Sequence, residues 1–337
     1  MTAVSGRPPA AGVLIVKPGS MGDVIHALPV LSALRAAWPG CPVSWVVDTR
    51  WAPLLEGNPH LTHTIEFPRE HFRGVPGLIR ALPWALGLRR HRPGICLDLQ
   101  GLLRSALIGR MTSPGQLLGL SDAREGARWF YDDVVPVEAR AHSVHRYLSV
   151  LNLLGLEVPR EPEFWLPSGT LPASTPAVPY ILVHPFSRGA GKSLPAGALA
   201  SLCKELAPTP VVLAGGAAPM APEGRHVVNL LGTTSLAELI GLIRGAAHVV
   251  SVDSGPAHLA AALGRPLLAI HTWTDPQLVG PYSTGAWIWQ GGEIRRQTLT
   301  GGTHVPGGMP DEAAARRIAA HVLAHCTAGI AKGGFSA

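Results

Sequence analysis

Three segments of the chain place polar residues that handle phosphates or protons at the ends of expected strands. The first, KPGSMGD at 17–23, follows an apolar run and ends in Asp23. Its two glycines allow a sharp turn from strand to helix and leave room for a ligand. A carboxylate at a helix start can serve catalysis, but Asp is also a favoured N-cap residue. This segment alone favours capping, and it lacks the GxGxxG spacing of a dinucleotide-binding loop.

The second segment, HPFSRGAGKS at 184–193, comes close to the spacing of a phosphate-binding P-loop. That loop requires glycine at position 186, where this chain has Phe186, and a smooth helix entry, where this chain has Leu194-Pro195. A nucleoside triphosphatase of the Walker type is therefore excluded. The remaining polar residues, Ser187, Arg188 and Lys192, suit a diphosphate, although the same residues also fit a solvated loop without a ligand.

The third segment, SVDSGPAH at 251–258, places a carboxylate at a strand end, followed by a glycine turn and a helix start. Exposed N–H groups and the helix dipole make such a place an anion site. His258 alone would indicate a packed core histidine, but beside Asp253 and Gly255 it indicates a phosphate site. A further segment, GTTSLAE at 232–238, contains an S-x-x-E capping box and is structural when taken alone.

No group of residues has the spacing of a metal site. Neither Asp132-Asp133 nor the DLQ of 98–100 forms a D-x-D pair, and no set of His, Cys and Asp has ligand spacing. We therefore expect no metal. The four cysteines lie far apart in apolar surroundings, which indicates reduced packing residues. They are Cys41, Cys96, Cys203 and Cys326.

Short apolar runs alternate with helix-length segments, which predicts βαβ units and parallel sheets. The expected strands are 12–17, 42–48, 64–67, 95–99, 180–185, 211–215, 226–230, 248–253 and 266–271. The expected helices include 23–38, 75–90, 142–154 and 311–325. The proline-rich stretch 167–179 reads as a linker. We expect an N-terminal domain over 1–166, a C-terminal domain over 180–310, and a final helix and tail over 311–337 that packs back toward the N-terminal domain. Ligands of doubly wound domains bind at the carboxyl ends of the strands, where the three segments lie.

The composition is that of a folded protein with excess positive charge. Of 337 residues, 47% are apolar and 15% charged, and 28 Lys and Arg face 22 Asp and Glu. These proportions exclude disorder and favour acidic partners, such as phosphates or an anionic membrane surface. The basic run and aromatic signature of nucleic-acid-binding proteins are missing, so we expect no nucleic-acid partner. Neither a secretory signal nor a membrane-length apolar run is visible, so we expect a cytoplasmic protein.

Together these segments resemble the bacterial lipopolysaccharide heptosyltransferases of glycosyltransferase family 9, and within it the heptosyltransferase I group. The likeness spans residues from about 12 to about 285 and rests on VLIVKPGSMGDVIHALP, LDLQGLLRSAL, the AREG of 123–126, HPFSRGAGKSLP, TTSLAEL, VSVDSGPAHLAAALGRP and TDPQLVGPYS. The resemblance implies the GT-B fold: α/β, with two Rossmann-like doubly wound parallel-sheet domains facing across a cleft. It also implies inverting, metal-independent transfer of L-glycero-D-manno-heptose from ADP-heptose to a Kdo hydroxyl of Kdo-lipid A, without a cofactor.

By position, the resemblance makes Asp23 the general base that takes the proton of the acceptor hydroxyl. It assigns Lys192 to the diphosphate of the donor, whose departing charge this lysine and a helix end would stabilise in place of a metal. The tryptophan that relatives carry nearby is Leu194 here. The full set of implied donor-binding residues is Ser187, Arg188, Lys192, Thr234, Asp253, Ser254, Gly255 and His258.

The implied acceptor is acidic and would bind in the N-terminal half, at Gly22, Arg69, Arg73 and Arg124. Segment 75–88 is apolar and is followed by three arginines within four residues. This pattern suits a helix on a membrane surface, but it fits equally a helix packed on its own domain. The resemblance places the protein on the inner face of the cytoplasmic membrane.

Two other functions stay open at this point. One is a transferase of the same fold that uses another ADP-sugar or a non-lipid acceptor, because no residue type here reads the heptose itself. The other is a nucleotide-sugar-binding protein without turnover, which the joint presence of Asp23, Lys192 and Asp253 disfavours.

Overall fold

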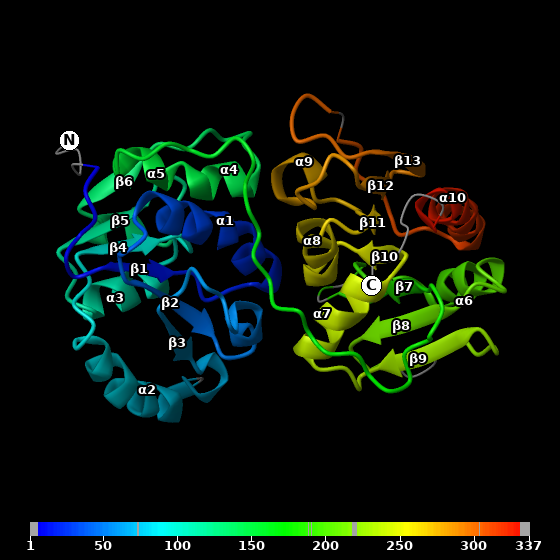
Figure 1. The fold of residues 1–337 in the computed structure, drawn as a ribbon, viewed down its shortest axis with the longest axis horizontal. Coiled ribbons are helices and arrows are strands. Elements are labelled where there is room, and N and C mark those ends of the chain that lie inside the picture. Colours follow the sequence, from blue (N-terminus) through cyan, green and yellow to red (C-terminus); the bar gives the residue numbers. More distant parts are fainter. Residues whose placement is uncertain are drawn as a thin grey trace. The chain divides into compact units, whose positions relative to one another are not determined.

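Short apolar runs such as the VLIV of 13–16 become strands that are buried on both faces, as parallel sheets require. The computed structural model describes residues 6–72, 74–187, 189, 191–217, 221–302 and 304–330. Arg73 and Arg188, two of the predicted binding residues, lie outside the described residues. The chain divides into two units, Met1–Pro167 and Ser168–Ala337 (Figure 1). The division falls at the start of the proline-rich stretch.

The first unit contains a sheet of six parallel strands in the order β3-β2-β1-β4-β5-β6. The strands are β1 (Val13–Val16), β2 (Val43–Asp48), β3 (His63–Phe67), β4 (Ile95–Asp98), β5 (Gln116–Leu120) and β6 (Asp133–Val135). The first four were expected, and β5 and β6 were missed. Gly119 interrupts the apolar run of β5, and a Cβ there would lie only 2.1 Å from the ring of Tyr131. The glycine that weakens the strand signal is thus required by packing.

Helices cover both faces of this sheet. On one side α1 (Met21–Ala37) packs against α4 (Ser143–Leu148), and α5 (Val150–Leu153) follows. On the other, α2 (Gly74–Leu88) packs against α3 (Leu103–Met111), and both bury side chains in a cluster with Leu14 and Val16. Three 3-10 turns complete the unit: η1 (Ala52–Leu55), η2 (Arg69–Phe72) and η3 (Ala127–Phe130). The single helix predicted over 142–154 is wrong, because Ser149 bonds its hydroxyl to a backbone carbonyl between two short helices.

The second unit repeats the arrangement with seven strands in the order β13-β12-β11-β10-β7-β8-β9. Only β13 runs antiparallel to its neighbour. The strands are β7 (Ile181–His184), β8 (Val211–Gly215), β9 (Val227–Leu231), β10 (His248–Val252), β11 (Leu267–Ile270), β12 (Trp287–Gln290) and β13 (Glu293–Arg296). The helices are α6 (Ala196–Glu205), α7 (Leu236–Gly245), α8 (Gly255–Ala262), α9 (Pro276–Val279) and α10 (Glu312–Ile330).

The C-terminal helix α10 is longer than expected and packs against α6 in the second unit (Figure 1). Its apolar residues, from Ala314 to Cys326, complete the core on that face of the sheet. The predicted return of segment 311–337 to the first unit stays a prediction. The linker also contacts the second unit, since the Thr170 N–H donates to the carbonyl of Ala237 in α7 at 3.0 Å.

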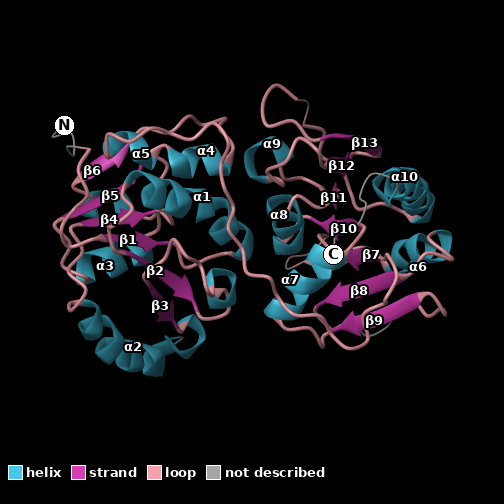
Figure 2. Cartoon of the chain, in the orientation of Figure 1, coloured by secondary structure: helices cyan, strands magenta, loops and turns pink. Residues whose placement is uncertain are grey.

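Each sheet has the strand order of a doubly wound fold (Figure 2). The chain first adds strands on one side of the sheet's first strand and then returns to add strands on its other side. The turning point lies between β1 and β4 in the first unit and between β7 and β10 in the second. Ligands of such sheets bind at that point, outside the carboxyl ends of the strands. Each unit therefore has a defined place for chemistry.

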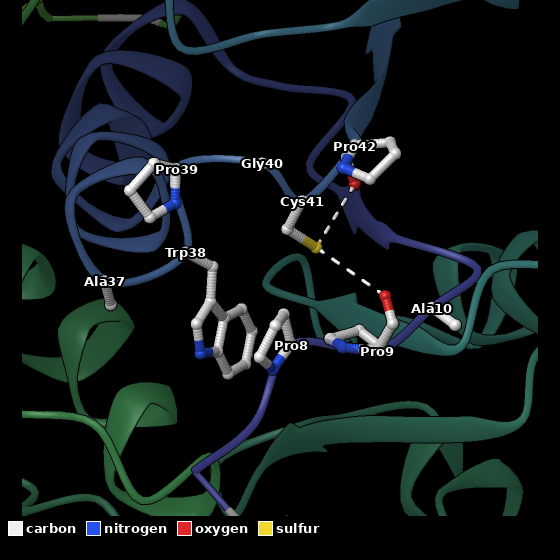
Figure 3. Close-up of a pocket in the computed structure, with 9 residues that line it drawn as sticks. All are labelled: Pro8, Pro9, Ala10, Ala37, Trp38, Pro39, Gly40, Cys41 and Pro42. Carbon is white, nitrogen blue, oxygen red and sulfur yellow. Dashed lines mark hydrogen bonds between the residues drawn. The ribbon is translucent and has the colours of Figure 1, made fainter.

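An apolar pocket lies at the opposite, amino edge of the first sheet (Figure 3). Its walls are Pro8, Pro9 and Ala10 before β1 and the residues from Ala37 to Pro42 before β2. Cys41 is buried here, with its sulfur 3.8 Å from the carbonyl oxygens of Pro9 and Pro42. All four cysteines are buried and unpaired, as predicted. The pocket carries no polar side chain suited to the chemistry of the strand ends.

Within the described part of the chain, every helix is too short or too polar to cross a membrane.

Candidate active site

Asp23 lies in the first turn of α1, at the carboxyl edge of the first sheet. Ser20 is the N-cap residue of this helix, and its backbone N–H and its hydroxyl both donate to Asp23 Oδ2, each at 2.9 Å. Asp23 therefore takes part in capping, but as the third helical residue of a capping box whose N-cap is Ser20, and not as the N-cap residue that the segment favoured. Capping uses one carboxylate oxygen, so the surroundings of Oδ1 decide what else Asp23 can do.

Asp23 Oδ1 contacts a tyrosine and a lysine. The Tyr147 hydroxyl donates to it at 3.0 Å, and the Lys17 ammonium lies 3.7 Å away. Lys17 also donates to the Tyr147 hydroxyl at 2.8 Å and to the carbonyl of Leu99 at 3.0 Å. The Lys17 side chain is 2% exposed, whereas that of Asp23 is 37% exposed. Lys17, Tyr147 and Ser20 thus hold the carboxylate of Asp23, and its exposed part remains accessible to a ligand.

The protonation states of this group follow from burial and charge. Burial raises the pKa of Asp23, but the Lys17 ammonium and the hydrogen bonds from Ser20 and Tyr147 outweigh burial and lower it below its ordinary value. Burial lowers the pKa of Lys17, which Asp23 opposes. Burial also raises the pKa of Tyr147 well above its ordinary value. At neutral pH a carboxylate therefore accepts a hydrogen bond from a phenol that keeps its proton.

A second carboxylate, Asp98 at the end of β4, organises the adjoining loop. It accepts four hydrogen bonds, from the N–H groups of Gln100 and Gly101 and the hydroxyls of Ser105 and Tyr131. Gln100 in turn accepts a bond from the Gly19 N–H at 3.2 Å. Asp98 is fully buried and is satisfied by these donors. It fixes the loop beside Asp23 instead of facing a substrate.

The predicted acceptor residues are distributed along this edge of the sheet. Gly22 is buried inside α1, while Arg69 and Arg124 are exposed. The Arg124 N–H donates to the carbonyl of Gly101 at 2.8 Å, which anchors it beside the Asp98 loop. Arg69 lies in η2 and acts electrostatically on Arg104. Both described arginines therefore offer positive charge at the edge that carries Asp23.

In the second unit, Lys192 and Asp253 form an ion pair with 2.8 Å between Nζ and Oδ2. Lys192 lies in the loop after β7, and Asp253 follows β10, so the pair occupies the turning point of this sheet. The Ser187 hydroxyl donates to the backbone carbonyl of Asp253 at 3.1 Å. Three predicted donor-binding residues are thus brought together from positions more than sixty residues apart.

The loop after β11 completes the surroundings of Asp253. The Thr274 hydroxyl donates to Asp253 Oδ2 at 2.8 Å and lies 3.1 Å from His271 Nδ1. Burial lowers the pKa of His271 to about 4, so its imidazole is neutral at neutral pH. Burial raises the pKa of Asp253, but the Lys192 ammonium, which donates a hydrogen bond to it, outweighs burial and lowers it. Trp273 lies beside the lysine, with its ring centre 5.2 Å from Nζ.

The other predicted donor residues lie at the same edge. Ser254 is the N-cap residue of α8, with its hydroxyl 3.2 Å from His184 Nδ1, and Gly255 is the first residue of that helix. His258 is buried in α8 and acts electrostatically on Asp253. Thr234 is half-buried in the turn between β9 and α7, at the carboxyl end of β9. Parallel strands place all these residues along one edge of the sheet.

Sequence reasoning missed several residues of these two groups. His184 is the last residue of β7 and His271 directly follows β11. Polar residues at the carboxyl ends of strands are candidates for a ligand site, so the sequence could have indicated both. Thr274 follows His271 by three residues and shares that signal in part. No sequence signal could have indicated Tyr147, because it lies 124 residues from Asp23 and inside an ordinary helical pattern.

No cluster of three or more His, Cys, Asp or Glu side chains among the described residues is placed to hold a metal ion. The cation that faces Asp253 is an ammonium group.

Comparison with known proteins decides the family. A family model described as glycosyltransferase family 9 (heptosyltransferase) matches residues 84–300, which is more than half of the chain. The chain belongs to glycosyltransferase family 9. Both the predicted family and the predicted class of enzyme, a glycosyltransferase, are confirmed.

Curated relatives of this family 9 member extend the likeness to residues outside that match. The lipopolysaccharide heptosyltransferase 1 of Pseudomonas aeruginosa is 30% identical over 287 residues, which cover 80% of this chain and 81% of that protein. The lipopolysaccharide heptosyltransferase 1 of Escherichia coli K12 is 30% identical over 289 residues, which cover 80% of this chain and 90% of the relative. Asp23 and the residues around Lys192 thus belong to a chain that is similar to these enzymes over most of its length.

Solved structures confirm the predicted GT-B fold class with its two Rossmann-like domains. The E. coli heptosyltransferase WaaC with ADP-2-deoxy-2-fluoro heptose matches with a TM-score of 0.76 at 25% identity, covering 93% of this chain and 99% of that one. The E. coli ADP-heptose lps heptosyltransferase II matches with a TM-score of 0.72 at 22% identity, which shows the same fold.

Proposed function

We propose that this glycosyltransferase moves L-glycero-D-manno-heptose from ADP-heptose to a Kdo hydroxyl of Kdo-lipid A, with inversion and without a metal ion. The relatives named lipopolysaccharide heptosyltransferase 1 support the donor sugar and the type of acceptor. The likeness to a heptosyltransferase structure with an ADP-heptose analogue supports the nucleotide. The observation in this chain that carries the proposal is the Lys192–Asp253 pair at the turning point of the second sheet.

In the proposed reaction, the second unit holds the donor. Asp253 accepts hydrogen bonds from sugar hydroxyls, and Lys192 turns from Asp253 to the diphosphate. The bond between the anomeric carbon and the phosphate oxygen breaks, and its electron pair leaves with ADP. The Lys192 ammonium stabilises that charge where it develops, together with the amino end of α8.

Asp23 acts on the acceptor in the first unit. Its carboxylate takes the proton of the attacking hydroxyl as the oxygen bonds to the anomeric carbon from the side opposite ADP, which inverts that centre. The low pKa of Asp23 keeps it ionised at neutral pH but makes it a weak base. Proton transfer therefore occurs late, when the attacking oxygen has become strongly acidic. Arg69 and Arg124 pair with the acidic groups of the acceptor.

The test is an assay of ADP release with ADP-heptose and a Kdo-bearing lipid A precursor, each omitted in turn. Release is expected only with both substrates present. Release without the acceptor, or equal rates with another ADP-sugar, would contradict the proposed donor and acceptor.

Metal independence has its own test. Turnover in excess EDTA should equal turnover with added magnesium, because Lys192 supplies the positive charge beside the leaving group. A strict requirement for magnesium would reject this part of the proposal.

The proposed location is the inner face of the cytoplasmic membrane, where a lipid-linked acceptor would be met. Exposed apolar side chains on α2, α3 and η3 of the first unit support this location.

A further inference from the structure

The helix α2 turns an apolar stripe to solvent. Ile79, Leu82 and Leu86 are spaced by three and four residues, so they share one face of the helix. All three are exposed, and Ile79 reaches 73%. The opposite face already meets the sheet, through Leu88 and Trp84, which pack in the cluster beneath. The stripe is therefore additional to the face that the domain needs for its own core.

The stripe continues on two neighbouring elements. Helix α3 packs against α2 (Figure 1), and η3 packs against α3. On α3 the exposed residues Leu103, Leu107 and Met111 lie four residues apart on one face. On η3, Trp129 is 91% exposed. We call this set the docking surface, and it consists of Ile79, Leu82, Leu86, Leu103, Leu107, Met111 and Trp129.

This concentration of apolar side chains sets the surface apart from the rest of the described chain. Only five other large apolar residues with described side chains are exposed, and they are Leu171, Val178, Trp273, Val279 and Val305. Scattered exposed residues need no explanation, but exposed apolar side chains gathered on elements that pack side by side indicate an interaction site.

The charges on these elements have a single sign. Neither α2, the turn after it to residue 92, nor α3 contains an Asp or Glu. Their arginines are Arg80, Arg89, Arg90, Arg92, Arg104 and Arg110. Arg110 forms an ion pair with Asp132 on a neighbouring segment, at 2.7 Å, and the more distant Glu125 and Asp48 act electrostatically on Arg104. An apolar surface bordered by cations fits a partner that is apolar inside and anionic at its face.

We propose that the docking surface inserts shallowly into an anionic lipid bilayer, with the bordering arginines on the lipid phosphates. Helix α2 has 15 residues and is too short to span a bilayer, so it lies in the plane of the interface. An exposed tryptophan suits the same depth. The proposal deepens the proposed function, since a lipid-linked acceptor resides in such a bilayer.

The docking surface adjoins the edge that carries Asp23. Helix α3 begins directly after the loop that Asp98 fixes, and Gln100 of that loop accepts a hydrogen bond from Gly19. Arg104, next to Leu103, lies close to Arg69, since burial and then repulsion by Arg69 lower its pKa. A headgroup at the bilayer surface would therefore meet the acceptor-binding edge without leaving the membrane.

The experiment measures the binding of the full chain to vesicles by flotation. Vesicles of phosphatidylethanolamine with phosphatidylglycerol should bind the protein at least tenfold more tightly than vesicles of phosphatidylcholine. The double variant Ile79→Ser, Leu82→Ser should lose at least tenfold in binding. The control Leu171→Ser, Val178→Ser removes two other apolar residues that are more than half exposed, and this variant should bind as the parent does. Trp129→Phe should reduce the blue shift of fluorescence on binding.

Several results would overturn the proposal: no binding to anionic vesicles, equal loss in the control, or equal affinity for neutral vesicles. A change of oligomeric state in the Ile79, Leu82 variant without vesicle binding would assign the surface to a protein partner instead. Thermal unfolding checks that the variants fold, and Arg89→Glu, Arg90→Glu provides a second test through charge alone. Vesicle binding needs no donor sugar, so this experiment tests the docking surface independently of the proposed heptose transfer.

Discussion

The hydroxyl of Tyr147 donates a 3.0 Å hydrogen bond to Oδ1 of Asp23 from a residue 124 positions further along the chain. The contact joins α1 to α4, two helices that pack on the same side of the first sheet. Lys17 donates to the same hydroxyl, so the phenol can direct its own proton only toward the carboxylate. The orientation of Asp23 is thus fixed by one helix cap and one distant tyrosine.

Removal of the charge on Asp23 tests its role as base. In Asp23→Asn the fold and the affinity for ADP should be retained, while kcat falls by about 10² to 10⁴, the usual contribution of a general base. The measurement is ADP release, with ADP binding by calorimetry as the control. Full turnover in this variant would leave Asp23 as a helix cap alone.

Tyr147→Phe removes the hydrogen bond on Oδ1 and leaves the ring. We expect kcat to fall about tenfold, which corresponds to the loss of one hydrogen bond to a charged group. Loss of a donor to the ionised form raises the pKa of Asp23, so the acidic limb of the rate profile should move to higher pH. A purely structural tyrosine would lower stability without moving that limb.

Lys192→Ala should lower kcat by about 10² to 10³, as removal of one group that stabilises a developing charge does elsewhere. Lys192→Arg keeps the charge and should recover part of the loss. The alanine variant also leaves Asp253 without its 2.8 Å partner, so ADP affinity is measured alongside the rate. Equal rates for the alanine and arginine variants would argue against a role for the charge.

The dependence of stability on pH follows from Asp253. Its pKa is lower in the folded protein than in the unfolded chain, so its contribution to stability is present above the unfolded value of about 3.9 and is lost as pH falls through the lowered value. The free energy of unfolding should decrease from about pH 5 to about pH 3. In Asp253→Asn that decrease should be smaller, as urea unfolding at each pH would show.

Gly119→Ala tests the packing beneath the Asp98 loop. The new methyl would meet the Tyr131 ring, whose hydroxyl donates to Asp98 at 2.7 Å. Overpacking should cost about 1–3 kcal/mol of unfolding free energy. Tyr131→Phe, which keeps the ring and loses only the hydrogen bond, serves as the comparison. An unchanged melting temperature in Gly119→Ala would show that the ring moves freely.

Local patterns were sufficient for much of the fold. Strands β1 to β4 and β7 to β11 were predicted to within about one or two residues because near-continuous apolar runs between turn residues leave few other structures. Strand β5 was missed because Gly119, which packing against Tyr131 requires, interrupts its apolar run. Strands β6, β12 and β13 were missed as well. Helix α10 was expected on the basis of its own pattern, but its packing against α6 depends on residues more than a hundred positions away.

The sequence by itself determined which side chains stand at the strand ends: Asp23, Lys192 and Asp253 follow apolar runs, and parallel strands collect such residues at one edge. It also determined the excess of arginine and the absence of acidic residues within α2 and in the turn after it to residue 92. Only the tertiary structure decided that Lys192 pairs with Asp253, that Tyr147 and Lys17 support Asp23, and that α2, α3 and η3 share one apolar surface. The reason is physical, since these contacts join residues tens to more than a hundred positions apart, and only the packing of helices onto sheets brings them within reach.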